Sequence, residues 1–316
     1  MTYTVGQLIQ ATDYNGFVST NVGANVNVVW NTGYGQTAIS TVSAAGTITA
    51  AQWASLVNTI TSLGAHTVTP LTARSAPTAG TTIAVLADVN SDLGSIFLNR
   101  YNAVSSGSQY TGWTGTNSKT SNTSGANWTI TFTNTVTWAS AAAATYFFNA
   151  GGLIKIDVSK TSTGELGDAE WNDLANTLSG DIYISGLAAA HTIAGVSYTG
   201  TTRIGGSVSP SIYSTGTGWD ALTAGAGGTI VYNQFADTAP YTSNFIQHTI
   251  AKGAGSDTLV ITTLWSNADS DVISGGTAAS GATPGTAPCT IVTYYPPETT
   301  NLTSTWGTPT VAATTT

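Results

Sequence analysis

The sequence predicts an α+β fold, with a small, mostly helical N-terminal domain followed by a β-rich region of antiparallel, sandwich-like strands and inserted short helices. Three observations predict this class. A short helical motif centred on one aromatic residue occurs three times. Apolar and polar residues alternate with a period of two after residue 127. Strand-like segments then recur at regular spacing between Gly and Asn/Asp turns, which is typical of an antiparallel sandwich.

The repeated motif reads aliphatic, two residues, small, Asp/Gln/Glu, aromatic, two residues, aliphatic, and it occupies residues 9–18, 48–57 and 166–175. The aromatic residue and the aliphatic residue three positions later share one helix face. We therefore expect a short helix in each copy, attached to a core by its aromatic side chain. Trp53 and Trp171 are predicted to be buried in equivalent positions.

The second copy carries the clearest start signal. Thr49 and Gln52 have the spacing of a capping box, and Ile48 precedes the cap, where a hydrophobic staple residue belongs. This helix is expected to continue through Ile60, and the third copy through Leu178.

Other segments complete the predicted helical domain, residues 1–103. Residues 31–40 predict a Gly-rich turn leading to a short strand, and residues 67–80, with two prolines, predict a loop. Residues 85–102 predict a helix with apolar spacing at Leu93, Ile96, Phe97 and Leu98. Residues 104–126 are rich in Ser, Thr, Gly and Asn, which favours a linker or long loop.

Residues 127–295 are the predicted β-rich domain. It opens with a strand through Trp128, Ile130 and Phe132, followed by a helix over residues 141–148 that the Gly pair at 151–152 ends. Further strands are predicted at residues 153–158, 182–184, 192–199, 229–235, 244–251, 258–265 and 290–295. Residues 296–316 form a low-complexity tail, which we expect to become ordered only against a neighbouring subunit.

Charge is scarce: the 316 residues include 7 Lys+Arg, 15 Asp+Glu, 3 His and 1 Cys. The basic residues never cluster, which argues against nucleic-acid binding. No secretory signal is visible and no stretch approaches the length of a membrane span, so no membrane is expected as a partner. A polar but nearly uncharged surface can be desolvated against other subunits without burying unpaired charge. This composition is typical of an assembly protein or adhesin and unusual for an enzyme.

Several segments resemble a known family. The two motif copies ITAAQWASL and LGDAEWNDL, the block YFFNAGGLIKI at 146–156 and the stretch YNQFADTAPY at 232–241 are similar to virion structural proteins of tailed bacteriophages, above all those of cyanophages. The resemblance covers residues 1–300, and the YFFNAGG block is its most specific part. It implies a fibre or appendage component of the particle and carries no catalytic residues.

Acidic residues suggest two weak cation sites. Asp168, Glu170 and Asp173 lie at the start of the third helical motif, where they could hold a hard cation. The helix dipole favours acidic residues in a first turn without any cation, and this is the preferred interpretation. Asp269 and Asp271 form a D-x-D without the Gly or Glu of a calcium loop.

Catalytic patterns are missing from the sequence. His66, His191 and His248 are scattered without metal-ligand spacing. Glu165 and Asp181 could flank a sugar as paired carboxylates, but no pattern supports that geometry. The sequon at residues 127–129 is expected by chance. We predict no hydrolytic activity, no catalytic residue, no cofactor and no metal.

Three aromatic residues in Gly-rich loops are candidate contact residues: Tyr110, Trp113 and Trp219. If exposed, they could stack on sugars of a host surface or, as the favoured alternative, contact a sister subunit.

The sequence therefore predicts a non-enzymatic structural component of a tailed-phage virion, a tail or neck fibre or appendage subunit assembled in the host cytoplasm. Long strand edges with few charges predict an obligate homo-oligomer, and three-fold symmetry, a trimer, suits a fibre that projects along an axis. Expected partners are copies of the chain, other virion proteins and a host-surface glycan. Alternatives are a capsid decoration protein, a carbohydrate-binding adhesin and, least favoured, a glycan depolymerase.

Overall fold

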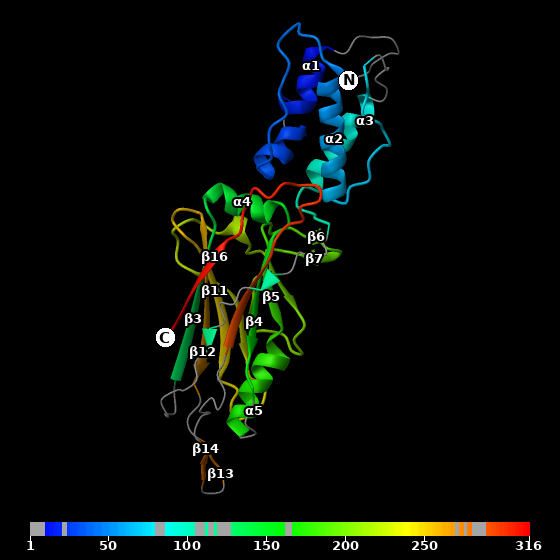
Figure 1. Cartoon of the computed structure of the whole chain (residues 1–316). Helices are drawn as coiled ribbons and strands as arrows, with labels where there is room; N and C mark the ends of the chain where they lie inside the picture. The colour runs from blue at the N-terminus through cyan, green and yellow to red at the C-terminus, as the bar shows by residue number, and fades with distance from the viewer. Residues whose placement is uncertain are drawn as a thin grey trace.

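The computed structural model confirms the α+β class: a helical unit sits at one end of a longer antiparallel β unit (Figure 1). The structure describes residues 10–20, 24–79, 86–104, 111–112, 117–118, 128–161, 166–268, 272–274, 277–279 and 289–316. One contiguous buried cluster contains residues of both units, from Tyr14 and Trp53 to Trp138 and Ile261. Within the described residues, no helix is long and apolar enough to span a membrane.

The helical unit contains α1 (Ala11–Asn15), the π-helices η1 (Gly16–Thr20) and η2 (Val28–Gly33), α2 (Ala50–His66) and α3 (Leu86–Leu98). Trp53 is buried as predicted, with its ring centroid 6.1 Å from that of Tyr14 and 6.2 Å from that of Phe17. The first two motif copies thus pack their aromatic residues against each other. Helix α3 ends four residues before the predicted boundary, so Leu98 lies exposed at its end.

The predicted capping box is present. The Thr49 side chain accepts a hydrogen bond from Gln52 N, and Gln52 Oε1 accepts one from Thr49 N. Helix α2 continues past the predicted Ile60 to His66, where the Thr67 hydroxyl donates to Leu63 O.

The short strand expected near residues 37–40 does not form. Side-chain amides take the place of a neighbouring strand there. Asn27 donates to Ile39 O and accepts from Ile39 N, and Asn15 makes the same two bonds with Val42. The segment is therefore extended but has no main-chain partner.

The β unit consists of two antiparallel sheets. The first has the order β1-β15-β4-β5-β8, with β2 also pairing β15, and the second has the order β16-β3-β12-β11-β10-β9. The first sheet comprises β1 (Thr111–Gly112), β2 (Asn117–Ser118), β4 (Leu153–Ser159), β5 (Asp181–Ile184), β8 (Thr201–Ile204) and β15 (Cys289–Tyr295). The second comprises β3 (Trp128–Thr137), β9 (Ile212–Tyr213), β10 (Thr229–Phe235), β11 (Phe245–Lys252), β12 (Thr258–Asn267) and β16 (Thr310–Thr315). The predicted linker 104–126 thus supplies two short strands.

Two-residue alternation explains the second sheet. In β3 and β12 every second residue is buried, and the register places Phe132 opposite Thr263 and Ile130 opposite Trp265.

Two hairpins lie outside the main sheets: β6 (His191–Ile193) with β7 (Val196–Tyr198), and β13 (Val272–Ser274) with β14 (Thr277–Ala279). The predicted single strand 192–199 is wrong, because the chain turns at Ala194 and Gly195, which both have positive φ.

Helices join the two units and close the sandwich. Helix α4 (Ala141–Asn149) begins at the predicted place, capped by Ser140, whose hydroxyl accepts from Ala143 N. Gly151 follows with φ of +89°, and a Cβ there would lie 2.4 Å from that of Ala103. The third motif copy forms α5 (Leu166–Asp173) and the π-helix η3 (Leu174–Ser179). Trp171 is buried as predicted, with ring centroids 4.9 Å from Trp128 and 5.6 Å from Trp265.

In the structure the C-terminal tail folds against its own chain, whereas the sequence suggested that it would become ordered only against a neighbour. Leu302 and Trp306 belong to the main buried cluster, and Glu298 is buried beside His66. The segment runs along the junction of the two units and then pairs as β16 with β3 (Figure 1). Two apolar anchors, a buried ion pair and strand pairing thus hold a segment of polar sequence.

Candidate functional site

The outer surface of the second sheet carries no charge. On β3 and β12 the outward positions are those whose neighbours along the strand are buried, and pairing with β3 identifies the outward positions of β16. We call these positions the threonine face. They are Thr310, Ala312, Thr314, Thr129, Thr131, Thr133, Thr135, Thr137, Thr258, Val260, Thr262, Leu264 and Ser266. All are exposed or half-buried, and hydroxyl and methyl groups dominate the surface.

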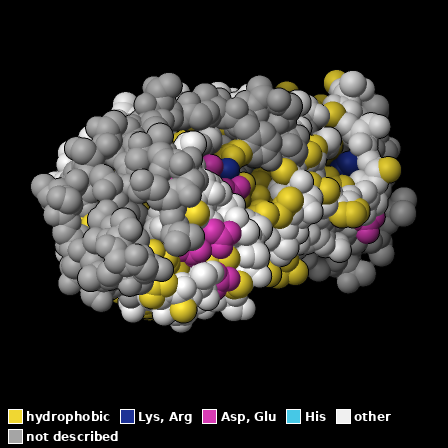
Figure 2. Space-filling view, turned by 90° about the horizontal axis from the view of Figure 1, so that it is seen from below, with side chains coloured by type: hydrophobic (Ala, Val, Ile, Leu, Met, Phe, Trp, Pro, Cys, Tyr) yellow, Lys and Arg dark blue, Asp and Glu magenta, His cyan; other side chains and the backbone are white. Residues whose placement is uncertain are grey.

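Exposed apolar side chains gather at the opposite edge of the sandwich. Of the large hydrophobic residues that the structure shows as exposed, most lie on three consecutive strands. We call this group the β8–β10 edge: Ile204, Ile212, Tyr213, Ile230 and Phe235. On the end of the molecule shown in Figure 2, the described residues show a few acidic and isolated basic atoms among hydrophobic and other uncharged groups.

Several of the few charged side chains form ion pairs inside the fold. Lys160 contacts Asp168, and both side chains are 1% exposed. Burial lowers the pKa of Lys160 to about 8. Asp168 therefore has an amine partner in the place where the sequence allowed a cation. Among the described residues, no group of His, Cys, Asp or Glu has the arrangement of a metal site. Burial raises the pKa of the neighbouring Glu170, with a hydrogen bond from Thr238 opposing the shift.

A second buried pair ties the C-terminal segment to α2. His66 Nδ1 lies 2.9 Å from Glu298 Oε1, and Glu298 also accepts from Thr300 N, Asn301 N and the Asn301 amide. Burial alone would raise the pKa of Glu298, but these hydrogen bonds outweigh it and lower the pKa to about 2. The carboxylate is thus held ionised as a structural group.

The three histidines lie apart, as their sequence spacing suggested. His191 Nδ1 donates to Ala189 O, and burial lowers the pKa of this ring. His248 lies in the sandwich core, stacked on Tyr232 at 5.3 Å, with Nδ1 3.0 Å from Thr263 Oγ1. Its Nε2 has no hydrogen-bond partner among the described residues, and burial lowers the pKa of His248 to about 3. A proton on that nitrogen would lie in an apolar core.

The remaining candidates form no catalytic pair in the described part of the chain. Asp181 lies 2.9 Å from Lys155 Nζ, as one side of an ion pair. Its hypothetical partner Glu165 lies outside the described residues, as do Asp269, Asp271, Tyr110, Trp113 and Asn127 of the sequon.

Trp219 is not an exposed loop aromatic. Its side chain is 2% exposed and stacks on Phe148 at 5.0 Å between ring centroids, with Lys252 Nζ 4.2 Å from the ring. The Gly-rich flanks allow close packing, so the sequence context that suggested exposure instead serves burial. Trp219 is a core residue and no contact for a glycan.

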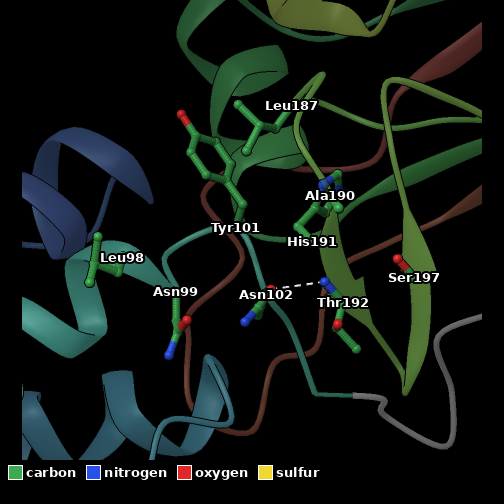
Figure 3. A pocket seen from close by; sticks show the side chains of 9 residues that line it. All are labelled: Leu98, Asn99, Tyr101, Asn102, Leu187, Ala190, His191, Thr192 and Ser197. Carbon is green, nitrogen blue, oxygen red and sulfur yellow. Dashed lines mark hydrogen bonds between the residues drawn. The ribbon is translucent and has the colours of Figure 1, made fainter. Parts of the chain in front are cut away.

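A cavity of about 250 Å³ lies where the end of α3 meets the β6–β7 hairpin (Figure 3). Tyr101, Asn102 and His191 line it, and Asn102 Oδ1 accepts from Thr192 N. Leu98, 80% exposed, stands at its rim. A second cavity of about 260 Å³ shares Tyr101 and adds Arg100. The aromatic ring thus lies at a polar cavity and at a second, mostly apolar one. Both cavities are large enough for a small molecule.

Comparison with protein-family models, curated proteins and solved structures finds no match to this chain. Function is therefore inferred from the surfaces and contacts of the chain itself.

Proposed function

We propose that this chain is a non-enzymatic structural subunit of a tailed-bacteriophage virion, a fibre or appendage component of the tail or neck that acts by self-assembly. The observation that carries the proposal is the uncharged threonine face, together with the apolar β8–β10 edge of the same sandwich. The resemblance of the motif copies and the YFFNAGG block to phage virion proteins supplies the particle context.

Both surfaces suit contact with other subunits. Burying a charged side chain without a partner is costly, whereas Thr hydroxyls can find hydrogen bonds across an interface and Thr methyls gain from burial. Exposed apolar side chains gain from burial at an interface, and five of them lie on the three strands of the β8–β10 edge. We propose a homotrimer, because closed three-fold symmetry buries such surfaces around an axis along which a fibre projects.

A charge placed on the threonine face tests the proposal. Thr133 lies at the centre of this face, opposite Thr262 on one side and Thr314 on the other. Thr133→Lys is expected to shift the mass measured by light scattering from an oligomer toward the 32.1 kDa protomer. Thr223→Lys, at an exposed loop position, is the matched control and should leave the oligomer intact. A wild-type protein that is monomeric at micromolar concentration contradicts the proposal.

The position of the protein on the phage particle distinguishes a fibre subunit from the alternative, a capsid decoration protein. Labelled protein on phage particles, imaged by electron microscopy, should appear on the tail or neck with rotational symmetry. A lattice of label over the capsid would favour the decoration protein, and no label on any particle would contradict both.

The second candidate function is carbohydrate binding, which the position of Tyr101 at a polar cavity and at a second, mostly apolar one favours. Tyr rings commonly combine apolar contact with a polar group at binding sites. Retention of an isolated monomer on host polysaccharide would favour this candidate over pure assembly.

A further inference from the structure

We propose that the C-terminal strand β16 is exchanged between copies, so that β16 of one subunit pairs with β3 of the next. This inference rests on the proposed self-assembly. Strand β16 is the longest of the described strands that end either main sheet. It contains no charged residue, no Pro and no register shift. These are the features that usually protect an edge strand from pairing with another chain.

Main-chain pairing holds β16, with little help from side chains. Six residues of β16 pair with β3, from Thr310 opposite Thr137 to Thr315 opposite Phe132. Of its side chains, Val311 packs against the main core, whereas Thr310, Ala312, Ala313 and Thr314 are exposed. Releasing this strand therefore costs mostly main-chain hydrogen bonds and little apolar burial.

The chain just before β16 is fixed. Gln36 donates to Thr303 O and accepts from Thr303 N, and the Thr305 hydroxyl donates to Tyr34 O. Trp306 is buried in the main cluster. Because these contacts stay in place, only the residues after Trp306 are free to move to another copy.

The three residues 307–309 form a short hinge between the anchor and the strand. Gly307 has φ of +65°, a conformation that other residues rarely adopt, and Pro309 restricts the chain immediately before β16. The four steps from Trp306 to Thr310 span at most about 14 Å. Short, stiff hinges favour exchange over closure within one chain. Donor and acceptor copies must therefore lie side by side along this sheet edge.

A second copy is the occupant that fits the vacated place. Without β16, β3 would present an open edge beside the buried Phe132 and Val136. The same strand from a neighbour restores each of these contacts, so exchange changes little in contact energy and links the subunits. In a closed ring every copy gives one strand and receives one, and no open β3 edge remains.

Cross-linking between differently tagged copies tests the exchange. Thr135 and Ala312 are register partners, so their Cβ atoms lie about 5 Å apart wherever β16 pairs with β3. One copy carries Thr135→Cys and the other Ala312→Cys, both in a Cys289→Ser background, and the two are co-expressed with different tags. After tandem purification, a short thiol cross-linker should join the two tags covalently.

Replacing Ala312→Cys by Thr223→Cys is the matched control and should give at least tenfold less cross-linked product. An oligomer by light scattering whose two tags do not cross-link overturns the exchange and leaves the proposed function intact. In that case the double variant Thr135→Cys/Ala312→Cys links only within one chain. A protein that is monomeric throughout overturns both.

Discussion

At the scale of single residues, side-chain carboxamides form many of the tertiary contacts that charged side chains form in other proteins. Four of them each bind both the N–H and the C=O of one residue in an extended segment, as a neighbouring strand would. This holds the chain in place without adding charge. The pairs are Asn15 with Val42, Asn27 with Ile39, Gln36 with Thr303, and Asn176 with Lys160.

Buried His248 predicts a pH dependence of stability. Its pKa is lowered to about 3 in the folded chain, while the unfolded ring titrates near 6.5. Below pH 6.5 the unfolded state therefore binds a proton that the folded state does not, and stability falls by up to about 1.4 kcal/mol per pH unit down to pH 3. His248→Phe keeps an aromatic ring against Tyr232 and should reduce this slope by one proton. Denaturant midpoints at pH 7, 6 and 5 measure it, and equal slopes in both proteins would contradict the prediction.

At the scale of elements, each copy of the helical motif depends on its aromatic anchor. Trp171 lies between Trp128 and Trp265 and attaches α5 to the second sheet. We predict that Trp171→Ala lowers the free energy of unfolding by about 3–5 kcal/mol, because it removes a large buried side chain and leaves a cavity. Leu98→Ala, at a side chain that is 80% exposed, is the control and should change it by less than about 0.5 kcal/mol. An unchanged unfolding temperature for Trp171→Ala would show that the aromatic residue is no anchor.

Elements fixed by local patterns were predictable from the sequence. The capping box located α2, and the alternation in β3 and β12 located two central strands. Other features depend on contacts between distant residues. The extended segment near Ile39 depends on Asn27, and β8 and β9 are too short to show a period. The sequence around Trp219 marks a Gly-rich loop but does not show that the loop packs on Phe148. The scarcity of charge could be read from the sequence. The threonine face could not be predicted, because its position depends on the register of three strands.

At the scale of the whole molecule, Gln36 joins the helical unit to the C-terminal segment. Gln36→Glu replaces the amide that donates to Tyr34 O and Thr303 O with a carboxylate oxygen, which these two carbonyls repel. We predict a loss of about 1–3 kcal/mol in unfolding free energy at pH 7, as expected for a buried polar group without its partner. Thermal unfolding measures it. Asn58→Asp, the same chemical change at an exposed position of α2, is the control. Equal losses of unfolding free energy for the two substitutions would mean that the hydrogen bonds of Gln36 to Tyr34 and Thr303 contribute nothing to stability.

The fold-back of the C-terminal segment makes the helical unit depend on residues far along the chain. His66 meets Glu298 across 232 positions, and Gln36 meets Thr303 across 267. These contacts can form only after the segment that carries Glu298 and Thr303 has left the ribosome, so the N-terminal helices lack these partners until then. A chain that stops short of Glu298 leaves a buried histidine without its carboxylate and the main core without Leu302 and Trp306.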